Sequence, residues 1–165
     1  MPQLNFYTQL LQAQEELNTA AAEHLDEEIN ILIHKLKFIP QEARPSVLVL
    51  QQEKGFEPLF NEQLIDALAI AGGRALADKM DDPAVICVIQ ADDALYSEIT
   101  NILEDPILSR STALKNNKLY IIQKPDFAQT PSSFLADVEI CAEIAQPKYF
   151  VYGREDKDWL KFDIA

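Results

Sequence analysis

The sequence predicts an α/β fold: a three-layer αβα, Rossmann-like lobe with a short, mostly parallel sheet, preceded by one long N-terminal helix. Three short runs rich in apolar and β-branched residues lie far apart in the chain, at residues 46–51, 83–90 and 119–123. Segments with a helical spacing of apolar residues separate these runs. Strands that alternate with helices form parallel sheets with helices on both faces. With 165 residues, of which 48% are hydrophobic, the chain can bury one core of this kind.

The first expected element is a helix over residues 8–38. Neither proline nor glycine interrupts this stretch, and leucine and isoleucine recur in it three and four residues apart. Acidic and amide residues crowd its first half, and Lys35 and Lys37 close its last turn, an order that suits the helix dipole. We therefore divide the chain into an N-terminal spine helix, residues 1–43, and a single α/β lobe with a packed C-terminal tail, residues 44–165.

The helices of the lobe have recognisable start and stop signals. The expected N-terminal caps are, in chain order, Asn61, Asp92 or Asp93, and Ser132 or Ser133. Gly72 and Gly73 end the first of these helices, because glycine readily adopts the left-handed conformation of a helix end. Asn116 and Asn117 form a turn before the third strand, and we expect the lysines beside them to be structural and not to bind phosphate. The aromatic residues of the tail predict that it packs back on the lobe.

The charge of the chain argues against two classes of partner. Asp and Glu number 27 and Lys and Arg 14, so the net charge of −13 repels phosphate backbones and anionic lipid headgroups. No apolar stretch approaches the roughly 20 residues of a membrane-spanning helix. We therefore expect no nucleic-acid binding and no membrane insertion. The opening MPQLNFYTQLLQAQEELN lacks the features of an export signal, which predicts a cytoplasmic location, or a periplasmic one if the chain is a fragment of a larger exported protein.

Motifs that carry chemistry are missing from the sequence. It contains no GxxxxGK[ST] or GxGxxG phosphate-binding loop and no GxSxG nucleophile motif. His24 and His34 are too far apart in the chain to form one metal site. Cys87 and Cys141 lie in apolar runs and are expected to be buried and unpaired. The sequence therefore predicts a non-enzymatic binding module with no catalytic residue, no metal and no cofactor.

Ligands of parallel α/β folds bind beyond the carboxyl ends of the strands. All three expected strands end in glutamine, and phenylalanines follow two of them in the chain. We predict that these amides and aromatic rings line a site for an uncharged or weakly charged ligand with an apolar face. The predicted ligand-binding residues are Gln51, Phe56, Gln90, Gln123 and Phe127. The alternative is that these glutamines are ordinary residues at the entry to loops.

Five stretches from Arg44 onward occur in an order known from other proteins: RPSVLVL, LIDALAIAGGRALAD, PAVICVI, DPILSRSTALKNNKLYII and CAEIAQPKYF. Together they resemble the C-terminal lobe of the class III, TroA-like, helical-backbone periplasmic substrate-binding proteins of ABC importers. The fourth stretch is similar to the family's Asp-Pro, a few residues, Ala-Val-Lys-Asn-Gly-Arg-Val-Tyr and an apolar pair. The expected N-terminal helix resembles the rigid helix that joins the two lobes of these proteins.

The resemblance implies a lobe that binds a metal chelate or a corrinoid: an iron–siderophore, haem or cobalamin. In the family an N-terminal lobe supplies the other half of the ligand cleft, and this chain has no counterpart of it. A helix of the family also carries a glutamate that docks on the permease. The stretch ADKMDDP spans the interval where that helix would lie and holds no matching glutamate, so a permease contact is not predicted.

An isolated lobe leaves one side of the N-terminal helix without cover. Each leucine or isoleucine that stays exposed loses the stabilisation of roughly 1.5–3 kcal/mol that its burial would give. Contiguous apolar patches on a surface mark interaction sites. The residues of this stripe are Leu10, Leu11, Leu17, Leu25, Ile29 and Leu32. We therefore predict a homodimer, or a lobe swap, through the N-terminal helix, in which the second copy covers the stripe and completes the cleft.

Two other functions stay open from the sequence. One is an intracellular protein-interaction or regulatory module that kept the fold, lost the ligand and works through the N-terminal helix and the aromatic tail. The other is an enzyme with an unrecognised site. A buried acid with a raised pKa at the end of a strand would favour the enzyme.

Overall fold

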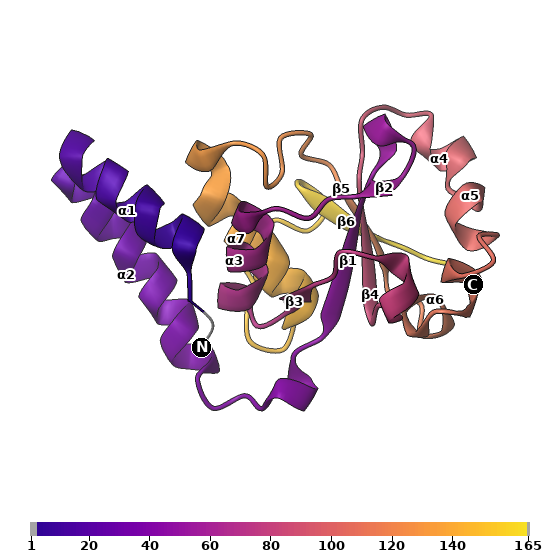
Figure 1. Cartoon of the computed structure of the whole chain (residues 1–165), viewed down its shortest axis with the longest axis horizontal. Coiled ribbons are helices and arrows are strands. Elements are labelled where there is room, and N and C mark those ends of the chain that lie inside the picture. The colour runs from indigo at the N-terminus through magenta and orange to yellow at the C-terminus, as the bar shows by residue number, and fades with distance from the viewer. Residues whose placement is uncertain (1–2, 165) are drawn as a thin grey trace.

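A computed structural model of the chain describes residues 3–164 and has the predicted α/β architecture, with a mostly parallel sheet between layers of helices (Figure 1). Helices α3 (Glu62–Ala71) and α7 (Phe134–Ala145) cover one face of the sheet. The other face is covered by α4 (Leu95–Glu98), α5 (Thr100–Leu103) and α6 (Thr112–Lys115). Short 3₁₀ helices lie between these elements, at Gln41–Ala43, Gln52–Lys54, Lys79–Asp81, Leu108–Arg110 and Pro131–Ser133.

The sheet contains the three predicted strands as parallel neighbours and adds shorter or antiparallel strands at its edges. Its strands are β1 (Ser46–Gln51), β2 (Glu57–Pro58), β3 (Arg74–Ala75), β4 (Val85–Ile89), β5 (Leu119–Ile122) and β6 (Trp159–Phe162). Their order is β2-β1-β4-β5-β6, with β3 also paired to β1. The pairs β1–β4, β4–β5 and β1–β3 are parallel, while β2 and β6 pair antiparallel. The sequence did not predict β2, β3 or β6.

The strands that follow β1 in the chain lie on both sides of it in the sheet. After β1, the hairpin to β2 and helix α3 lead to β3, which pairs with the edge of β1 that faces away from β4. The chain then crosses to β4 on the other side of β1 and continues to β5. The loops after β1 and β4 therefore leave the sheet next to each other, at the type of position where open α/β sheets bind ligands.

The N-terminal segment differs from the expected single helix. It forms two helices, α1 (Asn5–Leu17) and α2 (Thr19–Leu36), which pack side by side as a hairpin (Figure 1). Between them Asn18 has an extended backbone, with φ −159° and ψ 99°, and its side chain caps α2 by accepting a hydrogen bond from the N–H of Ala21 at 3.2 Å. A cap of this kind satisfies an N–H group at a new helix start. The prediction of one helix over residues 8–38 is therefore wrong.

The hairpin buries most of the apolar stripe within one chain. Leu25, Ile29 and Leu32 lie in the same hydrophobic cluster as residues of β1, α3 and α7. Leu10 and Leu11 of α1 pack against this cluster and are partly buried. The uncovered stripe from which we predicted a homodimer is therefore absent. Of its residues only Leu17, at the tip of the hairpin, is exposed. The division of the chain after residue 43 stays a prediction, and this cluster joins residues from both sides of it.

The parallel strands are buried on both faces, as their continuous apolar sequences predict. In β1, Val47 and Val49 belong to the cluster under α3 and α7, while Leu48 and Leu50 belong to the cluster under α4 to α6. Cys87 of β4 is buried, and both cysteines of the chain are free, as predicted. Within residues 3–164, every helix is too short or too polar to span a bilayer.

The helix caps follow the sequence at some positions and depart from it at others. Asn61 caps α3 by accepting a hydrogen bond from the N–H of Leu64 at 2.8 Å, and Gly72 ends that helix with φ +88°. Asp92 accepts a hydrogen bond from the N–H of Ala94, one residue before α4. Ser133 occupies the cap position of α7, but its hydroxyl donates hydrogen bonds and caps no N–H group.

The C-terminal tail packs back on the lobe, as predicted. Glu143 of α7 is buried and accepts three hydrogen bonds from the tail: from the N–H of Tyr152 at 2.8 Å, the N–H of Arg154 at 3.3 Å and Nε1 of Trp159 at 3.1 Å. Asn117, with φ +57°, forms the expected turn before β5, and its side-chain oxygen accepts a hydrogen bond from the N–H of Ile164. The turn thus holds the tail in place, which supports the structural interpretation of this region.

Candidate ligand-binding site at the carboxyl edge of the sheet

The carboxyl edge of the sheet brings together three of the predicted site residues. Gln51 ends β1, Gln90 follows β4 and Gln123 follows β5. The side chain of Gln123 donates a hydrogen bond from Nε2 to Oε1 of Gln90 at 3.3 Å. Gln51 and Gln90 line one shallow depression together with Pro125 and Gln129. The parallel strands therefore gather these amides at one edge, and their role in binding a ligand stays a prediction.

Gln52 organises this edge and was not among the predicted residues. Its Nε2 donates a hydrogen bond to Oδ1 of Asp92 at 2.8 Å. Its Oε1 accepts hydrogen bonds from the N–H groups of Ala91 and Asp92, at 2.7 and 3.1 Å. The side chain is buried, so it fills the crevice between the loops after β1 and β4. Nothing in the sequence distinguishes Gln52 from an exposed loop residue.

The two predicted phenylalanines lie away from these amides. Phe127 is fully buried in the hydrophobic cluster under α3 and α7, where it fills space next to Val49 and Cys141. Its ring belongs to the core, so the expectation that it lines the ligand site is not met. Phe56 is partly buried and lines a different hollow, beside the outer edge of β1.

The loop of residues 124–130, which supplies Pro125 and Gln129 to the edge, is held by Asp137 of α7. The Asp137 side chain is fully buried. Its Oδ2 accepts three hydrogen bonds: from Nε2 of Gln63 at 2.9 Å, Oγ of Ser133 at 3.0 Å and the N–H of Ala128 at 3.1 Å. Its Oδ1 accepts no hydrogen bond and lies 3.8 Å from Nζ of Lys124. The carboxylate thus anchors the loop to the helix behind it.

Burial raises the pKa of Asp137 to about 6, although the Lys124 ammonium and the hydrogen bonds to the carboxylate act in the opposite direction. A buried acid of this kind near the end of a strand is the feature that would favour an enzyme. Here the side chain is 0% exposed and three donors surround Oδ2. The arrangement accounts for a structural anchor, and it offers no surface at which a substrate could reach the carboxyl group.

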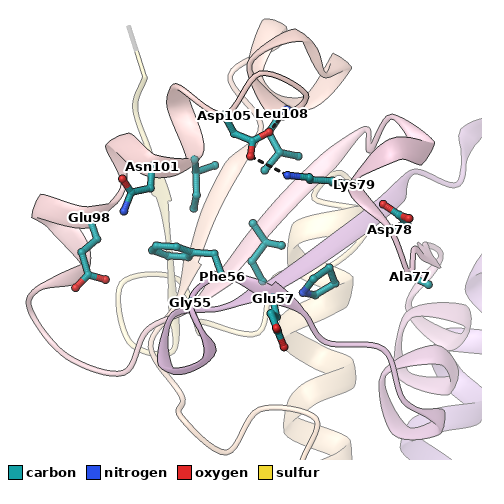
Figure 2. A pocket seen from close by; sticks show the side chains of 13 residues that line it. Gly55, Phe56, Glu57, Ala77, Asp78, Lys79, Glu98, Asn101, Asp105 and Leu108 are labelled. Atoms are coloured by element: carbon teal, nitrogen blue, oxygen red, sulfur yellow. Dashed lines mark hydrogen bonds and ion pairs between the residues drawn. The ribbon is translucent and has the colours of Figure 1, made fainter.

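A larger hollow, which we call the β1-edge groove, lies beside the outer edge of β1 on the face covered by α5 (Figure 2). Its volume is about 770 Å³. Three parts of the chain line it: the β1–β2 hairpin, the segment after β3, and helices α4 and α5 with the turn that follows them. Sequence patterns did not predict this groove, because its walls come from segments that only the fold brings together.

Comparison with known proteins supports the fold. No protein-family model matches the sequence, and no curated protein matches it. An ABC transporter substrate-binding protein from Listeria monocytogenes EGD-e is similar over 86% of this chain and 63% of its own, with 14% identity and a TM-score of 0.62. A protein of an ABC-type Fe³⁺-hydroxamate transport system from Saccharomonospora viridis is similar over 85% and 55%, with 16% identity and a TM-score of 0.62. The TroA-like periplasmic binding protein FepB from Veillonella parvula is similar over 84% and 49%, with 14% identity and a TM-score of 0.58.

At sequence identities of 14% to 16%, the similarity to these structures supports the fold alone. The chain spans between 49% and 63% of the length of these three solved structures. The matched part amounts to 84% to 86% of this chain. The chain has the fold of a lobe-sized part of the TroA-like substrate-binding proteins of ABC transporters.

Proposed function

We propose that the chain is a non-enzymatic ligand-binding module that takes a ferric chelate of the siderophore type at the carboxyl edge of its sheet. The observation that carries this proposal is the fold that it shares with ABC transporter substrate-binding proteins. One of the similar structures belongs to an Fe³⁺-hydroxamate transport system, which supports a siderophore as the ligand. Haem and cobalamin, which the sequence resemblance also implies, stay predictions without this support. No permease contact is part of the proposal.

The chemistry of the edge suits a chelate of this class. A ferric hydroxamate presents amide-like oxygens and hydrocarbon linkers around an ion whose charge the ligand neutralises. Glutamine amides both donate and accept hydrogen bonds, and Gln90, Gln123 and Gln129 are partly or fully exposed at the edge. Pro125 and Ile89 add apolar surface beside them. Such a rim binds a weakly charged ligand without the desolvation penalty of a buried ion.

The edge by itself is an incomplete site. Its depression has a volume of about 20 Å³, whereas small-molecule sites enclose roughly 300–1,000 Å³. The proposal therefore requires a second surface that closes over the chelate, supplied by another lobe or by a second copy of the chain. The argument for a homodimer through the N-terminal helix was an exposed apolar stripe. It no longer holds, since Leu25, Ile29 and Leu32 are buried. We instead propose that a dimer forms across the carboxyl edge, around the ligand.

The single tryptophan of the chain provides the test. Trp159 pairs with the last residue of β5, and the N–H of Gln123 donates a hydrogen bond to the carbonyl oxygen of Asp158 at 2.7 Å, so the backbone of Trp159 lies next to the edge. Its indole is buried and donates a hydrogen bond to Glu143. A titration with the ferric complex of a linear trihydroxamate is expected to quench Trp159 fluorescence saturably. The double variant Gln90→Ala/Gln123→Ala is expected to weaken binding about tenfold, because it removes hydrogen bonds of about 0.5–1.5 kcal/mol each.

Gln41→Ala is the matched control, since Gln41 is an exposed glutamine of the Gln41–Ala43 turn and lies outside the edge. Its affinity is expected to equal that of the wild type. Absence of saturable quenching in the wild type, or equal weakening by the control substitution, would contradict the proposal. Light scattering during the titration tests the proposed dimer, because a second copy doubles the mass when the chelate is present.

The burial of the residues named for it does not favour the alternative of a protein-interaction module. It was predicted to work through the N-terminal helix and the aromatic tail. Leu25 and Ile29 of that helix and Trp159 of the tail are at most 9% exposed and lie in the core. These residues hold the lobe together and are not available to a partner.

A further inference from the structure

The β1-edge groove has an apolar floor and is separate from the proposed chelate site. Leu50, Ile102 and Leu108 are at most 4% exposed and form this floor together with the partly buried Phe56 and Pro58. None of the residues that line the groove lines the depression at the carboxyl edge. Its volume of about 770 Å³ lies within the range of roughly 300–1,000 Å³ that is usual for small-molecule sites. A ligand of the groove therefore needs a hydrocarbon surface.

One end of the groove holds an ion pair. Nζ of Lys79 lies 2.9 Å from Oδ2 of Asp105 (Figure 2). Oδ1 of Asp105 accepts hydrogen bonds from the N–H groups of Ile107 and Leu108, at 2.9 and 3.0 Å. Asp78 at the same end caps the short 3₁₀ helix that follows it. Lys79 and Asp105 neutralise each other, while the Asp78 carboxylate keeps its negative charge.

The other end of the groove carries two acidic side chains that are not engaged. Glu57 of β2 and Glu98 of α4 make no side-chain hydrogen bond or ion pair within residues 3–164. The two residues flank Phe56 (Figure 2). The face of an aromatic ring attracts cations, and carboxylates beside it strengthen the attraction. This end of the groove is therefore complementary to a positive charge.

Phe56 adopts a left-handed backbone conformation at the end of the turn between β1 and β2, where its N–H donates a hydrogen bond to the carbonyl oxygen of Gln51 at 2.8 Å. Its φ is +65°, directly after Gly55 with φ +64°. Bulky residues rarely adopt this left-handed region, in which glycine or asparagine is at ease. Outliers of this kind recur at ligand sites, where the surroundings hold a side chain in place for use. The conformation presents the Phe56 ring to the groove between the two glutamates (Figure 2).

We propose that the β1-edge groove binds an aliphatic amine, with the hydrocarbon chain on the apolar floor and the ammonium group at Phe56 between Glu57 and Glu98. An anion is disfavoured by the unpaired carboxylates. A bare metal ion is also disfavoured, because it gains nothing from contact with the apolar floor. In addition, no group of three or more metal-ligating side chains occurs within residues 3–164. The hydrocarbon floor and the charged end lie next to each other, which matches the two parts of an alkylammonium ion.

The test is a titration of the ¹⁵N-labelled chain with hexylamine, followed by two-dimensional NMR. Saturable shifts are expected at the amides of Gly55, Ala77 and Asn101, which line the groove. The neutral analogue 1-hexanol is expected to leave these amides unsaturated at the same concentrations. If 1-hexanol binds equally well, the carboxylates do not select the ligand and the proposal is overturned.

Two variants separate a site from the general attraction of a chain with net charge −13 for cations. Glu57→Gln/Glu98→Gln is expected to weaken hexylamine binding at least about tenfold, as for the loss of charge-assisted hydrogen bonds. Glu15→Gln/Glu16→Gln removes the same charge from exposed positions of α1 and is expected to change binding less than twofold. Phe56→Leu keeps an apolar side chain and is expected to weaken binding about fivefold. Equal effects of the two double variants, or unchanged binding in Glu57→Gln/Glu98→Gln, would overturn the proposal.

Discussion

The carboxylate of Asp66 in α3 accepts a hydrogen bond from the backbone N–H of Tyr7, with Oδ2 2.9 Å from the nitrogen. Tyr7 lies in the first turn of α1, and the cap residue of that helix, Leu4, provides no side-chain hydrogen bond. Asp66 therefore caps α1 from another helix, where a negative charge also favours the helix dipole. The Tyr7 hydroxyl donates a hydrogen bond to Oδ1 of Asp26 at 2.7 Å, which ties α1 to α2. Tyr7 thus fixes the N-terminal hairpin to the lobe.

Removal of this distant cap is expected to loosen the hairpin. Asp66→Ala leaves the first N–H groups of α1 without their acceptor, and we expect the free energy of unfolding to fall by about 1–2 kcal/mol. Urea denaturation measures the change, and hydrogen exchange is expected to accelerate in α1. Asp81→Ala, at an exposed position, serves as the control and is expected to change stability by less than about 0.5 kcal/mol. Unchanged protection of α1 in Asp66→Ala would show that the cap does not hold the hairpin.

Asn18 determines whether the N-terminal segment is a hairpin or one helix. Asn18→Ala removes the cap of α2 and favours a continuous helix, so we expect a loss of about 1 kcal/mol in stability. A continuous helix carries α1 away from its own lobe, which favours exchange between two copies and a larger dimer fraction in light scattering. Asn30→Ala, within α2, is the matched control and is expected to leave the mass unchanged. A purely monomeric Asn18→Ala variant with wild-type stability would refute this role.

Asp137 makes the stability of the lobe depend on pH. Burial raises its pKa from 3.8 to about 6, so the folded chain binds this proton more tightly than the unfolded chain does. Its contribution to stability is therefore fully present below about pH 4, and is lost as the pH rises through about 6. The shift corresponds to about 3 kcal/mol. Asp137→Asn is expected to abolish this decline, which urea denaturation between about pH 3.5 and pH 7 measures; an identical pH profile in the variant would contradict the assignment.

Gly72 is expected to tolerate no side chain. Its φ is +88°, and a Cβ atom there would lie 2.8 Å from Cγ of Gln146 and 3.0 Å from Cδ1 of Leu36. We expect Gly72→Ala to lower the free energy of unfolding by about 2–4 kcal/mol. Gly55→Ala is the control, because Gly55 has a similar φ of +64° with nothing within 4 Å of the added atom. Its loss is expected to be about 1 kcal/mol; equal losses in the two variants would show that the clash is unimportant.

The part of the fold that follows from local pattern was predictable. The three parallel strands could be read from apolar runs, and helix α3 from Asn61 at its start and Gly72 at its end. The hairpin was missed because an unbroken helical pattern continues through Asn18, whose capping role depends on packing of α1 against α2. The strands β2 and β3 have two residues each and exist only by pairing with β1.

The candidate sites were likewise predictable only where local sequence pattern determines them. Parallel strands end at one edge, so the sequence could place Gln51, Gln90 and Gln123 together. Phe127 was placed there as well because a loop has no periodicity that tells a buried ring from an exposed one. The β1-edge groove depends on residues as distant in sequence as Glu57 and Glu98, whose proximity only the topology creates.

The most direct test of the account is to map the contacts of a chelate on the lobe. The gallium complex of a linear trihydroxamate is a diamagnetic substitute for the ferric complex and permits ¹⁵N NMR of the whole chain. The account predicts saturable shifts at Gln90, Ala91, Gln123 and Gln129, with the amides of the β1-edge groove unchanged. No saturable shift, or shifts confined to the N-terminal hairpin, would contradict a ligand site at the carboxyl edge.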